Sequence, residues 1–310
     1  MLSPKFQSSG DLLADRRFEW ARDCEAKGDF VAAADLMQQT LDITPSYASA
    51  WFALGGLREK LGDRAGAVEA YRRACAADPQ DKHGAVLMLM RLGVEPASGM
   101  PQAYVRELFD QYAPVFDEAL EEGLRYRAPA LLQATVEKLC AERSRAFRFG
   151  SMLDLGCGTG LAGAAFRPFV DRLVGVDLSS GMIAEARKKV LYDRLEIADM
   201  MRFLAGEAEQ EASYDLVVAA DVFVYAADLA SAIAGAAGAM KPGGLLAFTV
   251  ETHNGDGAIL GEKLRYSHGQ PLVRASLDAN GFEILRLEFA STRTEGGLPV
   301  PGLIAAAERR

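Results

Sequence analysis

The sequence predicts an α/β protein in which a small all-α domain precedes an open, mostly parallel sheet covered by helices. Two observations carry this prediction. A helical pattern repeats in the first third of the chain, and from residue 148 onward short apolar runs alternate with helical stretches. Such alternation is typical of parallel strands joined by crossover helices. A length of 310 residues is enough for two domains.

Composition and charge narrow the classes of function. Half of the residues are hydrophobic, as in an ordinary globular protein. The 34 basic and 43 acidic residues give a formal net charge of −9, so nucleic acid is an unlikely main partner, since it is bound by neutralising phosphates. The four cysteines stand far apart without a CxxC pair, so we expect no metal site, no disulfide framework and a cytoplasmic location. Neither an 18-residue apolar run nor a signal-peptide core is found, so we expect no membrane association.

The repeat lies within residues 16–92. Gly28-Asp29 recurs as Gly62-Asp63, 34 residues later. The second copy resembles the tetratricopeptide pattern through Trp51, Leu54, Gly55, Ala67, Tyr71, Ala74 and Pro79. We place this helical domain at residues 1–95. Such repeats form a concave surface that binds peptides or proteins, so a protein or peptide partner is expected, with self-association as the alternative.

A linker is expected at residues 96–102, because proline, glycine and serine are concentrated around this stretch. The following residues, 103–127, carry aromatic side chains at helical spacing, among them Tyr112 and Phe116. Two interpretations stay open for these rings: they pack a helix onto the next domain, or they form a lid across a ligand cleft.

The stretch Met152-Leu-Asp-Leu-Gly-Cys-Gly-Thr-Gly160 predicts a strand, a tight turn and a helix. Glycine accepts positive φ, and its missing Cβ lets a ligand lie against the backbone. The N-terminal N–H groups of the next helix would point at that ligand. A nucleotide-like cofactor is therefore expected here.

Two cofactor classes use this geometry. Gly158-x-Gly160-x-x-Gly163 fits the dinucleotide fingerprint, with Asp177 as the ribose-binding acid about 20 residues further on. Asp154 favours a different cofactor, because a carboxylate two residues before Gly156 repels a pyrophosphate and attracts a cation.

The same stretch resembles the first motif of class I S-adenosylmethionine-dependent methyltransferases, whose cofactor carries a sulfonium and an ammonium group. The likeness extends over residues 104–308 through three further strings, Val174-Gly-Val-Asp-Leu-Ser-Ser-Gly-Met182, Tyr214-Asp-Leu-Val-Val218 and Met240-Lys-Pro-Gly-Gly244. Together with the repeats, the chain resembles bacterial predicted methyltransferases of the type 11/12-like group that contain tetratricopeptide repeats.

This resemblance implies a Rossmann-like sheet of seven strands in the order 3-2-1-4-5-7-6, with the last strand antiparallel. The domain would span residues 103–310, with lid helices at 103–127, and would use S-adenosylmethionine and release S-adenosylhomocysteine. The expected strands are residues 151–155, 172–177, 195–197, 214–220, 245–250, 282–289 and 303–307. The expected helices of the sheet are residues 161–166, 181–189, 229–240 and 271–279, with a turn at 241–244.

The resemblance also assigns cofactor-binding roles at the carboxyl ends of the strands. Asp154 would hold the methionine ammonium, Asp177 the ribose hydroxyls, and Asp199 the adenine amino group. Asp221 would lie nearest the sulfonium. The remaining expected contacts are Gly156, Gly158, Gly160, Leu178, Met182, Met200 and Tyr112. Each acid could instead be a solvated strand end or a helix cap.

Methyl transfer from a sulfonium mainly requires positioning, and a base is needed only if the acceptor must lose a proton. The candidates for acid–base work are His268, His253 and Tyr225, followed by Glu251 and Tyr266.

The motifs of amide, adenine, cytosine and arginine methylation are missing, so a small-molecule acceptor or a protein- or carrier-bound acceptor is expected. Two other functions stay open. One is a scaffold that binds the cofactor without turnover, and the other is a nicotinamide-dependent oxidoreductase.

Overall fold

The computed structural model describes residues 6–96, 98–209 and 213–310. The chain forms two compact units, Met1–Leu108 with Glu262–Leu264, and Phe109–Gly261 with Arg265–Arg310. The division between Leu108 and Phe109 lies beyond the linker predicted at residues 96–102, of which residue 97 lies outside the described residues. In the described part of the chain, no helix is long and apolar enough to cross a membrane.

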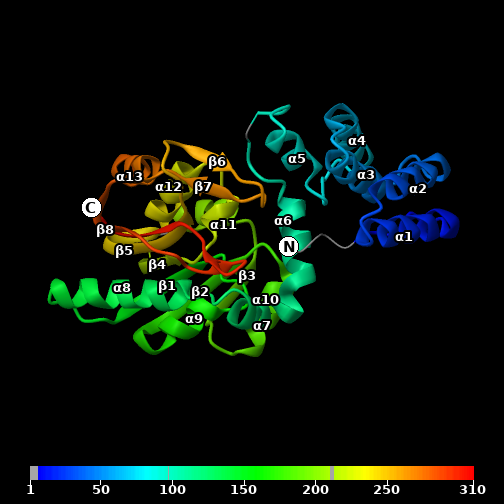
Figure 1. Cartoon of the computed structure of the whole chain (residues 1–310). Helices are drawn as coiled ribbons and strands as arrows, with labels where there is room; N and C mark the ends of the chain where they lie inside the picture. The colour runs from blue at the N-terminus through cyan, green and yellow to red at the C-terminus, as the bar shows by residue number, and fades with distance from the viewer. Residues whose placement is uncertain (1–5, 97, 210–212) are drawn as a thin grey trace. The chain divides into compact units, whose positions relative to one another are not determined.

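In its described residues, the first unit contains five helices before the linker and the beginning of α6 (Gln102–Tyr112), and successive helices pack antiparallel (Figure 1). Gly28 and Gly62 have φ of +82° and +78°, and each ends a helix. Asp29 and Asp63 follow them and cap the next helix by accepting backbone N–H groups. The 34-residue period therefore marks the positions where one helix ends and the next helix begins. The helices are α1 (Leu12–Ala26), α2 (Phe30–Ile43), α3 (Ala48–Lys60), α4 (Arg64–Ala77) and α5 (Ala85–Arg91).

Small residues allow α3 and α4 to approach closely. A Cβ at Gly55 would lie 2.5 Å from the ring of Tyr71. Tyr71 is fully buried, and its hydroxyl donates to Glu59 at 2.6 Å. The first repeat departs from the pattern: Trp20 is 52% exposed, and Phe18 fills the core in its place.

The second unit contains the predicted sheet. Its main strands follow the order β3-β2-β1-β4-β5-β11-β8, and β11 is antiparallel to both of its neighbours. This order is the predicted 3-2-1-4-5-7-6. The strands are β1 (Phe149–Leu155), β2 (Val170–Asp177), β3 (Arg194–Ile197), β4 (Tyr214–Ala219), β5 (Met240–Glu251), β8 (Phe282–Phe289) and β11 (Gly302–Arg309).

Several elements differ from the sequence predictions. The turn expected at residues 241–244 is a bulge inside β5, where Gly243 has φ of +75° and the pairing with β4 shifts register. Helix α11 (Met200–Ala208) begins directly after β3, because the Asp199 side chain caps it. Four short strands also lie in segments predicted as loops, β6 (Ala258–Leu260), β7 (Tyr266–His268), β9 (Thr294–Glu295) and β10 (Leu298–Pro299). Strands of two or three residues are too short for a period-2 pattern to indicate them.

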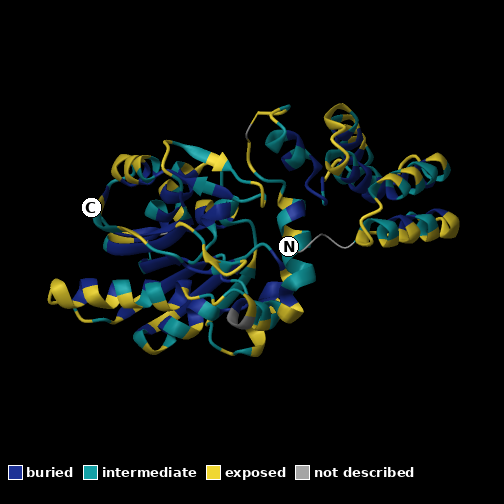
Figure 2. Cartoon of the chain, in the orientation of Figure 1, coloured by how far each residue is buried: buried dark blue, intermediate teal, exposed yellow. Residues whose placement is uncertain are grey.

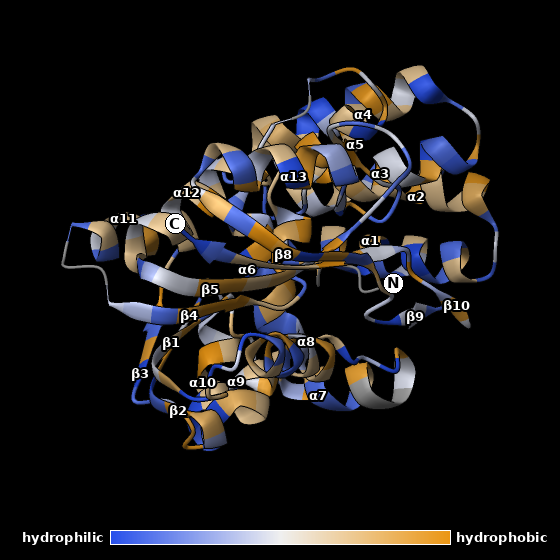
Figure 3. Cartoon of the chain, turned by 90° about the vertical axis from the view of Figure 1, so that its left-hand side faces the viewer, coloured by the Kyte–Doolittle hydropathy of each residue, from blue (hydrophilic) through white to orange (hydrophobic). Residues whose placement is uncertain are grey.

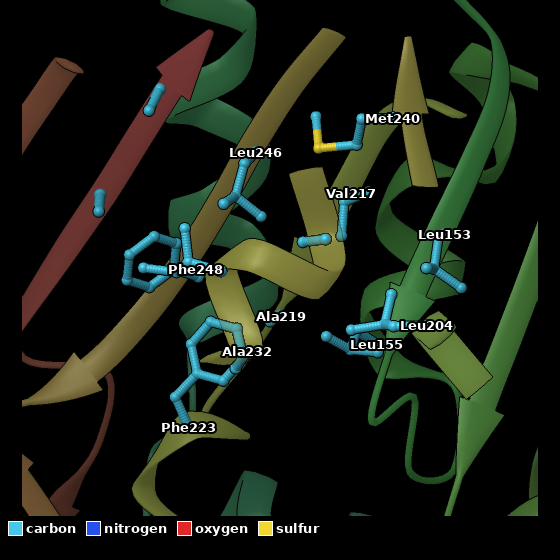
Figure 4. Close-up of a cluster of buried hydrophobic side chains, with 14 of the residues drawn as sticks. Leu153, Leu155, Leu204, Val217, Ala219, Phe223, Ala232, Met240, Leu246 and Phe248 are labelled. Atoms are coloured by element: carbon cyan, nitrogen blue, oxygen red, sulfur yellow. The ribbon is translucent and has the colours of Figure 1, made fainter. Parts of the chain in front are cut away.

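Helices cover both faces of the sheet, which explains the continuous apolar run of β4. Figure 3 shows α8–α10 on one side and α11–α13 on the other. Figure 2 shows the central strands buried between them, and Figure 4 shows leucine and phenylalanine side chains of neighbouring strands meeting the helices. The bounds are α8 (Ala128–Glu142), α9 (Leu161–Phe166), α10 (Ser180–Lys188), α12 (Leu229–Ala239) and α13 (Gln270–Ala279).

Candidate active site

The glycine loop and three of the predicted acids come together at the carboxyl edge of the sheet, where its parallel strands end. The glycine loop follows β1, Asp177 ends β2, Asp199 follows β3, and Asp221 follows β4. These strands are adjacent and parallel, so their carboxyl ends meet where open α/β sheets bind ligands.

The glycine loop is fixed by its neighbours. Gly156 has φ of +65°, and a Cβ there would lie 2.5 Å from the side chain of Val222. The Cys157 N–H donates to the Val176 carbonyl at 2.9 Å. The Gly158 N–H donates to Asp177 Oδ2, also at 2.9 Å. The loop after β1 is therefore tied to the end of β2.

Asp177 connects the loop after β1 with the loop after β2 through its two carboxylate oxygens. Its second oxygen, Oδ1, accepts the Ser179 N–H at 2.8 Å. Burial raises the pKa of Asp177 to about 6, although the two backbone hydrogen bonds oppose this rise. A carboxylate oxygen accepts more than one hydrogen bond, so Asp177 can still receive the two hydroxyls of a ribose.

Asp154, predicted to hold a ligand ammonium directly or through water, is buried and bonded to another side chain, and its predicted role stays a prediction. Its side chain is 1% exposed, and Oδ2 accepts the Tyr192 hydroxyl at 2.6 Å. Burial raises the pKa of Asp154 to about 7, and the nearby Asp177 adds to this rise. Asp154 lies beneath the glycine loop, because its position on β1 faces the interior.

Tyr192 was missed in the sequence, although a signal for it exists. A Cβ at Gly163 would lie 2.2 Å from its hydroxyl, and a Cβ at Gly175 would lie 2.7 Å from its ring. Gly163 lies inside α9 and Gly175 inside β2, where neither makes a turn. Glycines in regular elements mark the close approach of another group, and here that group is a tyrosine ring.

The residues predicted at the adenine are less exposed than expected. Met182, a residue of α10, is fully buried, so its side chain is closed to a ligand. Leu178 is half-buried. Asp199 caps α11 through Oδ1, which accepts the N–H groups of Met201 and Arg202. Met200 packs against the core beside it. Asp199 also lines an open depression of about 360 Å³ at the edge of the sheet.

A segment before α8 lies against the glycine loop, and we call residues Phe109–Leu120 the strap. It comprises the end of α6 (Gln102–Tyr112), η1 (Ala113–Val115), α7 (Phe116–Glu118) and the start of η2 (Ala119–Gly123). Asp110 accepts the Ser179 hydroxyl at 2.6 Å and the Gly181 N–H at 2.8 Å. Asp117 accepts the Thr159 hydroxyl and pairs with Lys189 at 2.6 Å. Neither acid was predicted, since no motif includes them.

The strap also carries an aromatic cluster. The Phe109 ring lies edge-on to Tyr225, with 5.3 Å between centroids, and Phe116 lies 5.6 Å from Tyr112. The rings of Phe109 and Phe116 also lie edge-on to each other, with 6.1 Å between their centroids. The structure thus links the predicted Tyr112 to the predicted Tyr225, which lies in η4 (Phe223–Tyr225) after β4. The strap therefore reaches from the glycine loop to the end of β4.

Asp221 belongs to a buried ionic network. It has φ of +56°, and its carboxylate accepts the hydroxyls of Thr249 at 2.7 Å and Thr292 at 2.9 Å. Arg293, which is 5% exposed, pairs with it at 2.7 Å. These contacts occupy Asp221, so its expected place nearest the sulfonium stays a prediction.

The same network includes Glu251 and Glu295. Arg293 contacts both carboxylates, and Arg265 lies 2.6 Å from Glu251 and also pairs with Glu295. Including Asp221, three carboxylates face two guanidinium groups, which leaves one excess negative charge. The two arginines were missed because the loop between β8 and β11 and the segment before β7 carry no recognisable pattern.

The histidines predicted as bases lie in the segment that follows the carboxyl end of β5, and each is bonded to a backbone group. His268 is fully buried, its Nε2–H donates to the Ala226 carbonyl at 2.9 Å, and burial lowers its pKa. The Nδ1 of His253 accepts the Gly255 N–H at 3.0 Å, within its own loop. Both contacts are structural, and the catalytic assignments of these histidines are not supported.

Of the remaining candidates, Glu251 is ion-paired and Tyr266 is fully buried. Tyr225 is half-buried, and burial raises its pKa. Among the residues that the structure describes, no three His, Cys, Asp or Glu side chains form a metal-binding group.

Comparison with known proteins supports both predicted domains. Residues 153–246 match the family model of a methyltransferase domain, and residues 48–81 match that of a tetratricopeptide repeat. The curated proteins include no match to this chain.

Among solved structures, magnesium protoporphyrin IX methyltransferase from Synechocystis with bound S-adenosylmethionine is 19% identical, covers 70% of this chain and 100% of its own, and gives a TM-score of 0.50. The same enzyme with bound S-adenosylhomocysteine is 20% identical, covers 67% and 99%, and gives a TM-score of 0.51. These similarities show the fold. The chain therefore combines a helical unit that matches a tetratricopeptide repeat with a unit that has the fold of class I methyltransferases, as predicted.

Proposed function

We propose that this chain is an S-adenosylmethionine-dependent methyltransferase. The observation that carries the proposal is the position of Asp177, whose carboxylate joins the Gly158 and Ser179 N–H groups at the carboxyl edge. The acceptor is a small molecule or a group carried by a protein, and the helical repeat unit binds a protein or peptide partner.

The charges at this edge fit a cationic cofactor. Asp110, Asp117 and Asp177 surround the glycine loop and the start of α10, and Lys189 pairs with one of them. Such a site would repel a pyrophosphate and attract a sulfonium and an ammonium. When bound, S-adenosylmethionine supplies a methyl group that is already activated. Asp177 would accept the ribose hydroxyls, and the loop glycines would let the cofactor approach the backbone.

The topology argues against the nicotinamide-dependent alternative. A dinucleotide-binding sheet of the 3-2-1-4-5-6 type continues with a parallel sixth strand. Here β11 is inserted antiparallel between β5 and β8. Together with the acids at the edge, this supports methyl transfer over hydride transfer.

In the proposed reaction, the chain positions the reactants and excludes water. The strap would cover the cofactor, with the rings of Phe109 and Phe116 facing the cleft. The pKa of Tyr225 is raised by burial, so this phenol stays protonated at neutral pH. It can donate a hydrogen bond to the molecule that receives the methyl group. A base is required only for an acceptor that must lose a proton.

A second candidate function is a scaffold that binds the cofactor without turnover. It is favoured because Asp221 and Glu251 are paired with arginines and because His253 and His268 are bonded to backbone groups. In this case the repeat unit would carry the function through its partner.

Two measurements separate these possibilities. Calorimetric titration with S-adenosylhomocysteine, with NADH as the parallel control, should show micromolar binding of the former alone. Binding of NADH alone would refute the proposal. Incubation with cell extract and methyl-labelled S-adenosylmethionine should then transfer label to an acceptor, whereas binding without any transfer supports the scaffold.

A further inference from the structure

The first described residues of the chain fold back onto the helical unit, and we call Phe6–Ser9 the N-terminal segment. The Gln7 N–H donates to Ser49 Oγ at 3.2 Å, and the Gln7 carbonyl accepts the Tyr47 hydroxyl at 2.6 Å. Both backbone groups of one residue are thus bonded to side chains from a distant helix. This arrangement recognises an extended main chain, whatever side chain it carries.

Phe6 occupies an aromatic and cationic pocket. Its ring lies edge-on to Phe18, with 4.8 Å between centroids, and the Arg22 guanidinium lies 4.7 Å from its centroid. The centroid of the His83 ring lies 6.1 Å from the centroid of the Phe6 ring. Edge-on ring pairs and cations over ring faces are both stabilising contacts. The pocket therefore selects an aromatic side chain at this position.

The residues that form this site come from successive helical pairs. Phe18 and Arg22 lie in α1, Ser49 lies in α3, and His83 precedes α5. Ser49 and His83 are buried and lie within hydrogen-bond distance of each other, with 3.0 Å between Oγ and Nε2. The hydroxyl that receives the Gln7 N–H is therefore held in place by the fold. Surfaces that run across stacked repeats bind extended chains in this way.

A short turn tethers the segment to α1. The Ser9 N–H and hydroxyl both donate to Asp15 at 2.7 Å, and the Ser8 hydroxyl donates to the same carboxylate. Since the tether is short, the segment is present at the site at a high effective concentration. A separate peptide must therefore compete with it.

We propose that the helical unit contains a binding site for an extended peptide with an aromatic side chain, and that Phe6–Ser9 occupy this site in cis. A partner peptide of the same chemistry displaces them. The proposal rests on the interaction role proposed for this unit, but its test needs no cofactor, so it can fail while methyl transfer stands.

The test uses a fluorescent synthetic peptide of residues 2–10 and the full chain, followed by fluorescence anisotropy. Phe6→Ala should weaken the segment in cis, so the full-chain variant should bind the peptide at least tenfold more tightly than the unchanged chain. The control is Phe289→Ala, which removes a 69% exposed phenylalanine from β8 and should leave peptide binding unchanged. A peptide with alanine in place of its phenylalanine should not bind.

Amide hydrogen exchange measured by NMR provides a direct second readout. In the full chain, the Gln7 amide should exchange at least tenfold more slowly than in Ser49→Ala, with the fold of the variant verified by circular dichroism. Equal peptide affinities for the unchanged chain and Phe6→Ala would overturn the proposal, as would exchange of Gln7 at the rate of an unfolded chain. Dimers that dissociate on Phe6→Ala substitution would also overturn it, because the segment would then bind a second copy.

Discussion

Replacing Asp177 tests the proposed cofactor site most directly. In Asp177→Asn the side chain keeps one oxygen, so one of the N–H groups of Gly158 and Ser179 loses its acceptor and faces an amide NH₂ instead. A hydrogen bond to a charged group contributes about 1.5–3 kcal/mol. The loss of one such bond to the ribose should weaken S-adenosylhomocysteine binding at least tenfold, which corresponds to about 1.4 kcal/mol. Calorimetric titration at pH 7.5, above the pKa of about 6, measures this change.

The matched control is Asp171→Asn, at the opposite end of β2. Asp171 is exposed and pairs with Arg148, so its replacement should leave cofactor affinity unchanged. Thermal unfolding of both variants verifies that the protein is folded at the titration temperature. Affinity within twofold of the unchanged protein in folded Asp177→Asn would refute the role of Asp177.

Four further substitutions, at three residues, test the buried groups. Burial raises the pKa of Asp154 to about 7, so the folded protein binds a proton at Asp154 more tightly than the unfolded chain does. This difference contributes up to about 4 kcal/mol to the free energy of unfolding below about pH 4, and the contribution is lost as the pH rises to 7. Asp154→Asn should therefore flatten the pH dependence of stability measured by urea unfolding at pH 5 and pH 8, and an unchanged profile would contradict this. Tyr192→Phe should cost about 1–3 kcal/mol through the lost hydrogen bond to Asp154, and Tyr192→Ala about 3–5 kcal/mol through the cavity as well; equal losses in urea unfolding would exclude a role for the ring. Arg293→Met should destabilise by about 3–5 kcal/mol, because buried carboxylates lose their partner, and part of the loss should be recovered at pH 5; a loss below about 1 kcal/mol at pH 8 would contradict this.

The sheet order was predicted through the resemblance of the sequence motifs to those of class I methyltransferases, and these motifs fall at strand ends. Gly156–Gly160 and Asp177 each follow an apolar run, so their meeting at one edge required only the rule that parallel strands end together. The burial of Asp154 could not be predicted, since it depends on Tyr192 filling a space between two elements. Local sequence gives no direction for a side chain at a strand end.

The contacts of Arg293 illustrate the same limit over a longer distance. Its partner Asp221 is 72 positions away, and the loop that carries it has neither a motif nor a period. The histidines were favoured for their chemistry, but His268 is fully buried in a three-residue strand and is therefore closed to solvent. Residue type identified candidates, and packing decided which of them are accessible.

The inserted strand β11 has a consequence for biosynthesis. Its residues 302–309 follow every other strand in sequence, yet it pairs with β5 on one side and with β8 on the other. Until a ribosome has released this stretch, β5 and β8 each lack a neighbour, and unpaired strand edges favour aggregation. The sheet can therefore close only after residues 302–309 have been translated, and removal of these residues would separate β8 from the sheet rather than shorten an edge.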